Sequence, residues 1–236
     1  MAERAGRDRG APGVENGGES GGGNGASALM LTCTMAADRD LFALLAGSVD
    51  RHVDPRITHR VIVPGAQIGL FRGFASPRRE IVAQEDVLPF RAWRAPEALC
   101  HLPLLGRRFR RPLYLTPRLR PLRGWMLQQV LKVESARTAA ETAVIHCDSD
   151  MCFVRGLPLE AVVPGGRPRF FATSLDRLPD GHCAWAQQAA ALLGADLPGD
   201  FRRTYIENAI VWSVAGARSM AERIESRTGR PLHEGL

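Results

Sequence analysis

Two aspartates, Asp148 and Asp150, follow a strand-like apolar stretch at 142–147 in the second half of the chain. Aspartate is a poor strand former, and its carboxylate is costly to bury unless it is paired or bound to a cation. Two carboxylates at the carboxyl end of a strand suit Mg²⁺ or Mn²⁺, which bind one or two carboxylates together with phosphate oxygens and water. The spacing therefore predicts either a divalent-metal site that neutralises a diphosphate leaving group, or a turn that the two side chains cap.

A second polar group lies upstream, on a helix expected at 124–139. Gln128 and Lys132 are four residues apart, so they share one face of that helix. Lys132 is the only lysine in a chain that otherwise uses arginine. An ammonium group is a compact charge with affinity for phosphate, and arginine does not substitute for it freely. The pattern predicts either a phosphate-binding lysine or an ordinary solvated side chain.

The composition is that of an ordinary globular protein. The chain has 236 residues, of which 45% are hydrophobic, and a net charge of +6, so it can bury one good-sized core. Nearly all of its cations are arginines, which together with much Ala, Gly and Pro indicate a GC-rich coding bias, so the basic charge is weak evidence for a nucleic-acid partner. No apolar run is long enough for a transmembrane segment, and no signal peptide is visible. We therefore expect neither a nucleic-acid partner nor a membrane span.

The cysteines argue against a disulfide framework. The chain has five of them, scattered and without a CxxC pair, which favours reduced thiols in a cytoplasmic protein. His146, Cys147 and Cys152 lie close together in the sequence, but no second ligand pair has the spacing of a zinc site.

The chain divides into a tail and one domain. Residues 1–27 are rich in Gly, Glu and Arg and cannot bury enough apolar area to offset chain entropy, so we expect a disordered tail followed by a single domain at 28–236. We expect strands at 28–34, 59–65, 79–87, 142–147 and 169–174, a strand or loop at 204–212, and helices at 38–53, 124–139, 182–194 and 215–229. This alternation predicts an α/β fold with an open, mostly parallel sheet and helices on its faces.

Two local patterns give finer expectations. In the helix at 38–53, helical spacing predicts that Asp38 caps the start. The same spacing predicts one buried face made of Leu41, Leu44, Leu45, Ser48 and Val49. After the aspartates, residues 151–154 return to apolar types, which predicts a second buried stretch.

Residues 89–123 lack clear periodicity. We expect a long loop or a pair of short elements, which inside a compact domain is usually functional or mobile. Between Cys100 and Lys132 the arginines are Arg107, Arg108, Arg110, Arg111, Arg118, Arg120 and Arg123, and the stretch holds no acid. They predict a solvated surface, and one or two of them could bind phosphate or an anionic acceptor.

The central motifs together resemble a known family. The residues that carry the resemblance are Gly124, Trp125, Gln128, Gln129, Lys132, Asp148, Asp150, Phe153 and Arg155. Their order, a G-W-x-x-Q-Q-x-x-K helix followed by a strand ending in D-x-D, resembles the glycosyltransferases of the GT-A fold. It is more closely similar to the bacterial DUF6492 family, which is often found with polysaccharide genes. The opening segments at 38–52 and 60–65 fit the same family, and the resemblance covers most of 28–236.

The resemblance implies a metal-dependent glycosyltransferase that uses a nucleotide-sugar donor and an unknown glycan or small-molecule acceptor. Asp150, and with it Asp148, would bind Mn²⁺ or Mg²⁺, while Gln128 and Lys132 would lie near phosphate or sugar. The base and ribose would lie at the end of the first strand, where the candidates are Thr32, Thr34 and Asp40.

An inverting transfer also needs a carboxylate base for the acceptor hydroxyl. The candidates are Asp176 and Glu207, each of which could instead be a structural or surface residue, and a retaining mechanism needs no base at that place. The sequence departs from the GT-A pattern in the His146-Cys147 pair before D-S-D, where a more apolar lead-in is usual. The chain also ends soon after the last expected helix, so we expect a short acceptor-binding part.

Three other interpretations remain open. A haloacid-dehalogenase-type phosphatase also uses D-x-D after a strand, with the first aspartate as nucleophile, but its motif usually lies near the chain start and its lysine follows the motif. A non-catalytic nucleotide- or nucleic-acid-binding protein could use the arginines of 89–123, but it would leave Asp148 and Asp150 without a role. A degenerate transferase could bind the nucleotide without turnover.

Overall fold

The computed structural model describes residues 25–96, 113–117, 119–176 and 179–235. A five-stranded sheet with the order β10-β7-β1-β2-β3 forms its centre. The strands are β1 (Ala28–Cys33), β2 (Thr58–Val63), β3 (Arg79–Ala83), β7 (Ala143–Cys147) and β10 (Ala209–Ser213). The first four run parallel and β10 runs antiparallel to β7. The expectation of an α/β fold with a mostly parallel sheet is therefore confirmed, while most of the expected 1–27 tail lies outside the described residues.

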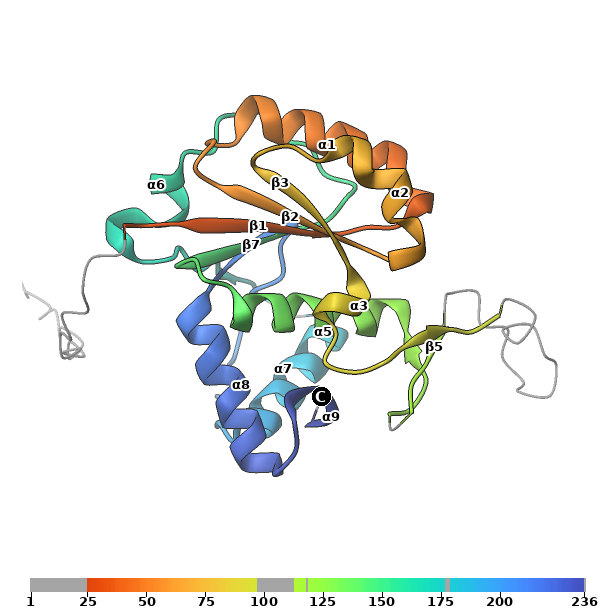
Figure 1. Cartoon of the computed structure of the whole chain (residues 1–236). Helices are drawn as coiled ribbons and strands as arrows, with labels where there is room; N and C mark the ends of the chain where they lie inside the picture. The colour runs from red at the N-terminus through yellow and green to blue at the C-terminus, as the bar shows by residue number, and fades with distance from the viewer. Residues whose placement is uncertain (1–24, 97–112, 118, 177–178, 236) are drawn as a thin grey trace, which may run out of the picture.

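Helices cover both faces of this sheet (Figure 1). Side chains alternate along a strand, so Met30 of β1 packs with the first core cluster and Leu31 packs with the second. The helices α1 (Arg39–His52), α2 (Ile68–Phe71) and α6 (Leu159–Val162) supply the first cluster. The helices α5 (Gly124–Thr138) and α8 (Val214–Thr228) supply the second. Because β1 and β7 are buried on both faces, their sequences read as continuous apolar runs.

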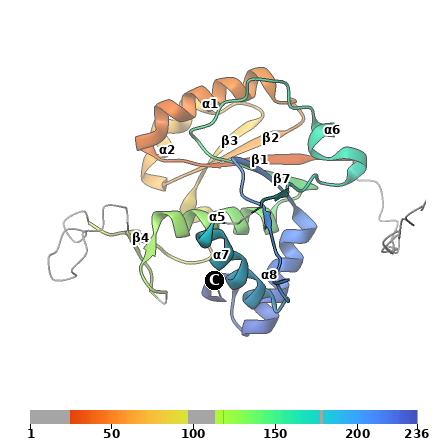
Figure 2. The same cartoon turned by 180° about the vertical axis from the view of Figure 1, so that it is seen from behind.

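The remaining elements are short or lie outside the sheet (Figure 2). They are α3 (Gln84–Val87), β4 (Trp93–Arg94), β5 (Leu113–Leu115), β6 (Leu122–Arg123), β8 (Thr173–Ser174), α7 (Asp180–Leu193), β9 (Arg203–Thr204) and α9 (Leu232–Gly235), with 3₁₀ turns at Ala36–Asp38, Gly65–Gln67, Arg72–Phe74 and Pro164–Gly166. The region expected as a loop or a pair of short elements, 89–123, contributes the antiparallel sheet β4-β5-β6. Arg107, Arg108, Arg110, Arg111 and Arg118 fall outside the described residues. Within the described ranges, no helix combines the length and the apolar composition needed to cross a membrane.

The predicted inner face of α1 was wrong in part. Leu45 and Val49 are buried, but Leu44 is 62% exposed, and Phe42 and Ala46 complete the inner face instead. Apolar residues are so dense in this helix that spacing alone fits two adjacent faces. The buried face is the one that holds Phe42, whose ring lies 5.7 Å from that of Phe71 and 5.2 Å from that of Phe74. Asp38 stands at the N-cap position but makes no side-chain capping bond.

The apolar stretch after the aspartates is not a buried strand. Residues 151–154 have no regular structure, and Val154 is 80% exposed. The segment is held to the first core cluster by Met151 and Phe153, and the Phe153 N–H donates to Ser48 Oγ at 3.0 Å. The strand expected at 169–174 is likewise reduced to Thr173–Ser174.

A buried ionic network lies behind β1. The Arg79 side chain is 3% exposed and donates to both carboxylate oxygens of Asp50, at 2.7 and 3.2 Å. Its Nε–H donates to His59 Nδ1 at 3.0 Å. His59 Nδ1 is therefore an acceptor, so the ring proton sits on Nε2, which donates to Thr32 Oγ1 at 3.1 Å. The network fixes α1, β1, β2 and β3 relative to one another.

Candidate functional site

The carboxyl ends of β1, β2 and β7 meet at one edge of the sheet, because these strands are parallel neighbours. Asp148 follows β7 directly at this edge. Lys132, on α5, reaches it from the adjoining face of the sheet, and its Nζ donates to Asp148 Oδ1 at 2.9 Å. The lysine side chain is 15% exposed and that of the aspartate 48%. The two charged groups that the sequence singled out separately therefore form one ion pair at the edge where open α/β sheets bind ligands.

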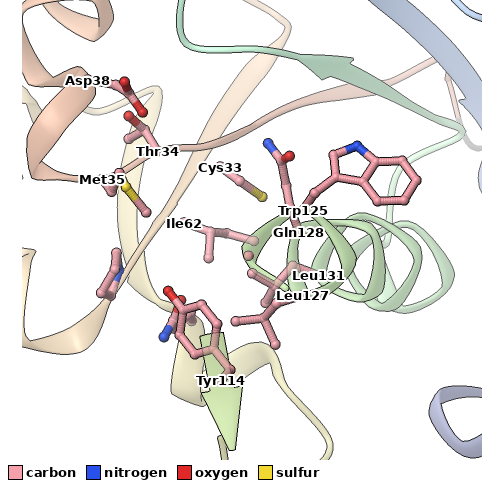
Figure 3. Close-up of a pocket in the computed structure, with 13 residues that line it drawn as sticks. Cys33, Thr34, Met35, Asp38, Ile62, Tyr114, Trp125, Leu127, Gln128 and Leu131 are labelled. Carbon is pink, nitrogen blue, oxygen red and sulfur yellow. The ribbon is translucent and has the colours of Figure 1, made fainter. Parts of the chain in front are cut away.

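A cavity of about 240 Å³ opens at the same edge (Figure 3). It is lined by Cys33, Thr34, Met35, Asp38, Ile62, Pro64, Gln84, Tyr114, Gly124, Trp125, Leu127, Gln128 and Leu131. The end of β1 and the turn after it form one wall, and the first two turns of α5 form the opposite wall. Tyr114 of β5 lies across one end. The cavity is mostly apolar with a few polar groups, as is usual for a site that binds an organic ligand.

The ion pair and the cavity are neighbours, because Leu131 lines the cavity and Lys132 follows it on α5. Burial raises the pKa of the Cys33 thiol to about 12, the Lys132 charge opposes the rise, and the Asp148 charge adds to it. Cys33 thus lies in the cavity wall and within electrostatic reach of both charged groups. Behind them, burial, followed by the charge of Lys132, lowers the pKa of His146 to about 3, so this imidazole is neutral near pH 7.

The sequence candidates at the end of β1 occupy different environments. Thr34 lines the cavity, and its buried Oγ1 has no hydrogen-bond partner within the part of the chain that the structure describes. Thr32 is fully buried against His59, away from the lining residues. Asp40 points into solvent on the first turn of α1 beside Arg39. Asp38, which the sequence predicted to cap the helix, is the acid that lines the cavity. The spacing did not predict the 3₁₀ turn at Ala36–Asp38, which takes Asp38 out of the capping geometry.

The two candidate bases lie on the β8–β9 side of the molecule, and both are exposed. Glu207 precedes β10, whose first residue, Ala209, pairs with Cys147 at the carboxyl end of β7. Since β10 is antiparallel to β7, the chain at Glu207 enters the sheet at the edge that carries Asp148. Asp176 follows β8, two residues after Ser174, which pairs with Arg203, and no described contact ties it to this edge.

Asp148 and Asp150 offer oxygens suited to a hard cation. Asp150 is exposed and makes no hydrogen bond or ion pair with any described residue. Asp148 keeps one carboxylate oxygen away from Lys132, which bonds the other. Among the described residues, no three or more His, Cys, Asp or Glu side chains are placed so that together they could hold a metal ion. Two carboxylates without further protein ligands match the way Mg²⁺ is usually held next to a phosphate, so the residues fit such an ion.

Comparison with known proteins assigns the family. The model of a family of unknown function, DUF6492, matches residues 27–235. The chain belongs to the DUF6492 family. The resemblance seen in the sequence is thereby confirmed, and no curated protein matches this DUF6492 chain.

Two solved structures resemble the DUF6492 chain at low similarity. One is WbbM, a bifunctional glycosyltransferase in its apo form, with a TM-score of 0.44, 11% identity, and coverage of 85% of this chain and 34% of that one. The other is the galactosyltransferase LgtC in complex with donor and acceptor sugar analogs, with a TM-score of 0.42, 11% identity, and coverage of 88% and 69%. The chain thus spans about a third of WbbM and about two thirds of LgtC.

Proposed function

We propose that this DUF6492 chain is a metal-dependent glycosyltransferase that moves a sugar from a nucleotide-diphosphate sugar to an acceptor hydroxyl. The observation that supports the proposal best is the Lys132–Asp148 ion pair beside a mostly apolar cavity at the carboxyl edge of the sheet. One end of such a site suits an uncharged ring system, and the other suits a diphosphate.

In this proposal the cavity takes the nucleoside. The orphaned Thr34 Oγ1 and the Asp38 carboxylate can bond ribose or base groups, and Tyr114 offers an aromatic surface at the end of the cavity. Gln128 lies one turn of α5 before Lys132, between the cavity and the ion pair, so its amide can reach the donor phosphates or sugar. Thr32 and Asp40, which the sequence suggested for this role, are left out because neither lines the cavity.

The diphosphate would lie at Asp148, Asp150 and Lys132. Mn²⁺ or Mg²⁺ on the two aspartates would neutralise the charge that develops on the leaving diphosphate. Lys132 adds a second positive charge from the side of α5, and Asp148 holds that ammonium group in place before the donor binds. The burial of Lys132 keeps its charge less screened by water than a surface lysine would be.

The acceptor would approach from the β10 side. Glu207 is the better candidate for a general base because the register of β10 with β7 brings its backbone to the edge that carries Asp148. Asp176 remains the second candidate. The acceptor itself would be a glycan or a small hydroxyl compound.

A thermal-shift panel tests the proposal directly. UDP-, GDP-, CMP- and dTDP-sugars are added to the full chain with and without Mn²⁺, and one of them should raise the melting temperature only when metal is present. Asp150→Ala should abolish this shift and Lys132→Met should weaken it, whereas Asp196→Ala, on an exposed loop, should leave it intact. If no sugar nucleotide shifts the wild type, or if the protein releases phosphate from simple phosphate esters and Asp148→Asn stops that release, the transferase proposal is wrong.

A further inference from the structure

Two tryptophans that the site described so far does not explain stack on each other at its border. Trp125 of α5 is 51% exposed and Trp185 of α7 is 48% exposed. Their rings lie 6.1 Å apart with an angle of 26° between the planes. The His182 ring stacks on Trp185 from the same helix, at 5.3 Å and 20°. We call these three rings, Trp125, Trp185 and His182, the aromatic ledge.

The ledge adjoins the cavity through a shared residue. Trp125 is among the residues that line the cavity (Figure 3). It also stacks on Trp185, so the ledge begins at the cavity wall. Lys132 lies seven residues further along α5, which is about 10 Å along the helix axis. A molecule resting on the ledge is therefore next to the place where the proposed donor binds.

The helix that carries Trp185, α7, contributes no fully buried side chain among its described residues. Most of these residues are nevertheless apolar. Large apolar side chains that gather at the surface usually mark a place where something binds. Trp125 and Trp185 differ from a lone exposed tryptophan because their half-exposed rings meet at the border of the cavity.

The chemistry of the ledge suits a sugar ring. Each aromatic face carries partial negative charge, and the face of a pyranose that presents several C–H groups is apolar and slightly positive. A nucleobase fits the ledge less well, because the neighbouring cavity already offers it hydrogen-bonding groups from Thr34 and Asp38. Both indole side chains keep about half of their surface exposed and come from two different helices, which fits a ligand of linked rings better than a single flat one.

We propose that the aromatic ledge is the acceptor subsite and binds a neutral, pyranose-containing oligosaccharide. This inference rests on the proposed function, since it places the acceptor beside the donor. It narrows the acceptor from any hydroxyl compound to a saccharide that presents an apolar ring face. Trp185 is a binding residue in this proposal and has no part in donor binding.

The test uses cellotriose, maltotriose and chitotriose as probes for the full chain. Tryptophan emission is titrated with each probe, and saturation-transfer NMR identifies the sugar protons that contact the protein. At least one probe should alter the emission of the wild type and show transfer mainly to the C–H groups of one ring face. Trp185→Ala should weaken that binding about threefold to tenfold, and Trp185→Phe should restore most of it. Trp93→Ala is the matched control because Trp93 is 53% exposed on β4 and makes no ring contact among the described residues.

The outcomes separate the two proposals. If none of the three probes changes the wild-type emission or receives saturation, or if Trp185→Ala binds as the wild type does, the ledge is not a saccharide site. Displacement of the probe by UDP alone would mean that the ledge holds the nucleobase, and would overturn the inference. If the probes bind and require Trp185 but no sugar nucleotide shifts the melting temperature, the ledge stands and the transferase proposal fails. If the donor binds with metal and Trp185→Ala changes nothing, the transferase proposal stands alone.

Discussion

Acid should destabilise this protein well above the pH at which carboxylates titrate. Two buried histidines, His59 and His146, are neutral in the folded state. Burial, followed by the charges of Arg79 and Arg78, lowers the pKa of His59 to about 3. Burial, followed by the charge of Lys132, does the same for His146. In the unfolded chain both should titrate near the ordinary value of about 6.5.

The sign and size follow from proton linkage. Below pH 6.5 the unfolded chain binds two protons that the folded chain does not, so the free energy of unfolding falls as the pH falls and continues to fall toward pH 3. The interval from pH 6.5 to pH 5 is about 1.5 pH units, and each unit costs about 1.4 kcal/mol per histidine. By pH 5 each histidine therefore lowers the free energy of unfolding by about 2 kcal/mol, and the pair lowers it by about 4 kcal/mol. This is a large part of the roughly 5–15 kcal/mol that stabilises a typical domain. Carboxyls with a lowered pKa, such as Asp54 beside Arg56, lose their contribution only at lower pH.

Urea unfolding followed by circular dichroism at pH 7 and pH 5 measures this loss. His146→Phe is the informative variant because its ring can keep the edge-to-face packing on Trp212, now 4.5 Å between centroids, without binding a proton. The variant should lose about 2 kcal/mol over this interval and the wild type about 4 kcal/mol. Equal losses in both proteins, or a wild-type stability that is flat between pH 7 and 5, would refute the reasoning.

Two further predictions concern buried groups. Asp50→Ala should lower the free energy of unfolding, measured by urea denaturation, by about 2 kcal/mol, because it leaves the buried Arg79 guanidinium without its carboxylate partner. The loss is not larger because Asp50 is half exposed, so water can replace part of the lost interaction. The control Asp196→Ala should change the free energy of unfolding by less than about 0.5 kcal/mol, and equal effects of the two variants would count against the network. Under native conditions at pH 7.5, iodoacetamide should modify exposed Cys152 but not Cys147 or Cys33, because burial raises the pKa of each of the latter two thiols to about 12. Peptide mass spectrometry reads this out, and labelling of Cys147 as fast as Cys152 would contradict it.

The sequence was most informative where residue type alone restricts where a side chain can lie. The mostly apolar stretches of β1 and β7 predicted strands, which the structure buries on both faces, and the parallel order followed from the alternation with helices. The single lysine and the D-x-D pair were found from residue type alone, and the structure joins Lys132 to Asp148.

The rest depended on contacts between distant segments, which spacing does not encode. Leu44 and Phe42 are both apolar, and Phe42 is the buried one because its ring packs against Phe71 and Phe74, more than 25 residues away in the sequence. The antiparallel entry of β10 beside β7, which brings Glu207 to the site edge, is a pairing of residues more than 60 positions apart. The stack of Trp125 on Trp185 likewise joins two helices that share no sequence pattern.

Trp125, Gln128 and Lys132 all project from α5, while Val130 on the same helix is anchored in the second core cluster. This one helix thus carries Trp125 of the proposed saccharide surface, one wall of the cavity and the lysine proposed to bind phosphate, and it sets the spacing between them. A change that tilts this helix would displace all three together, so affinities for both substrates would fall in step. Substitutions in the segments that face α5, such as β5 and α7, should therefore change the affinity for one substrate without the other, whereas substitutions that move α5 should not.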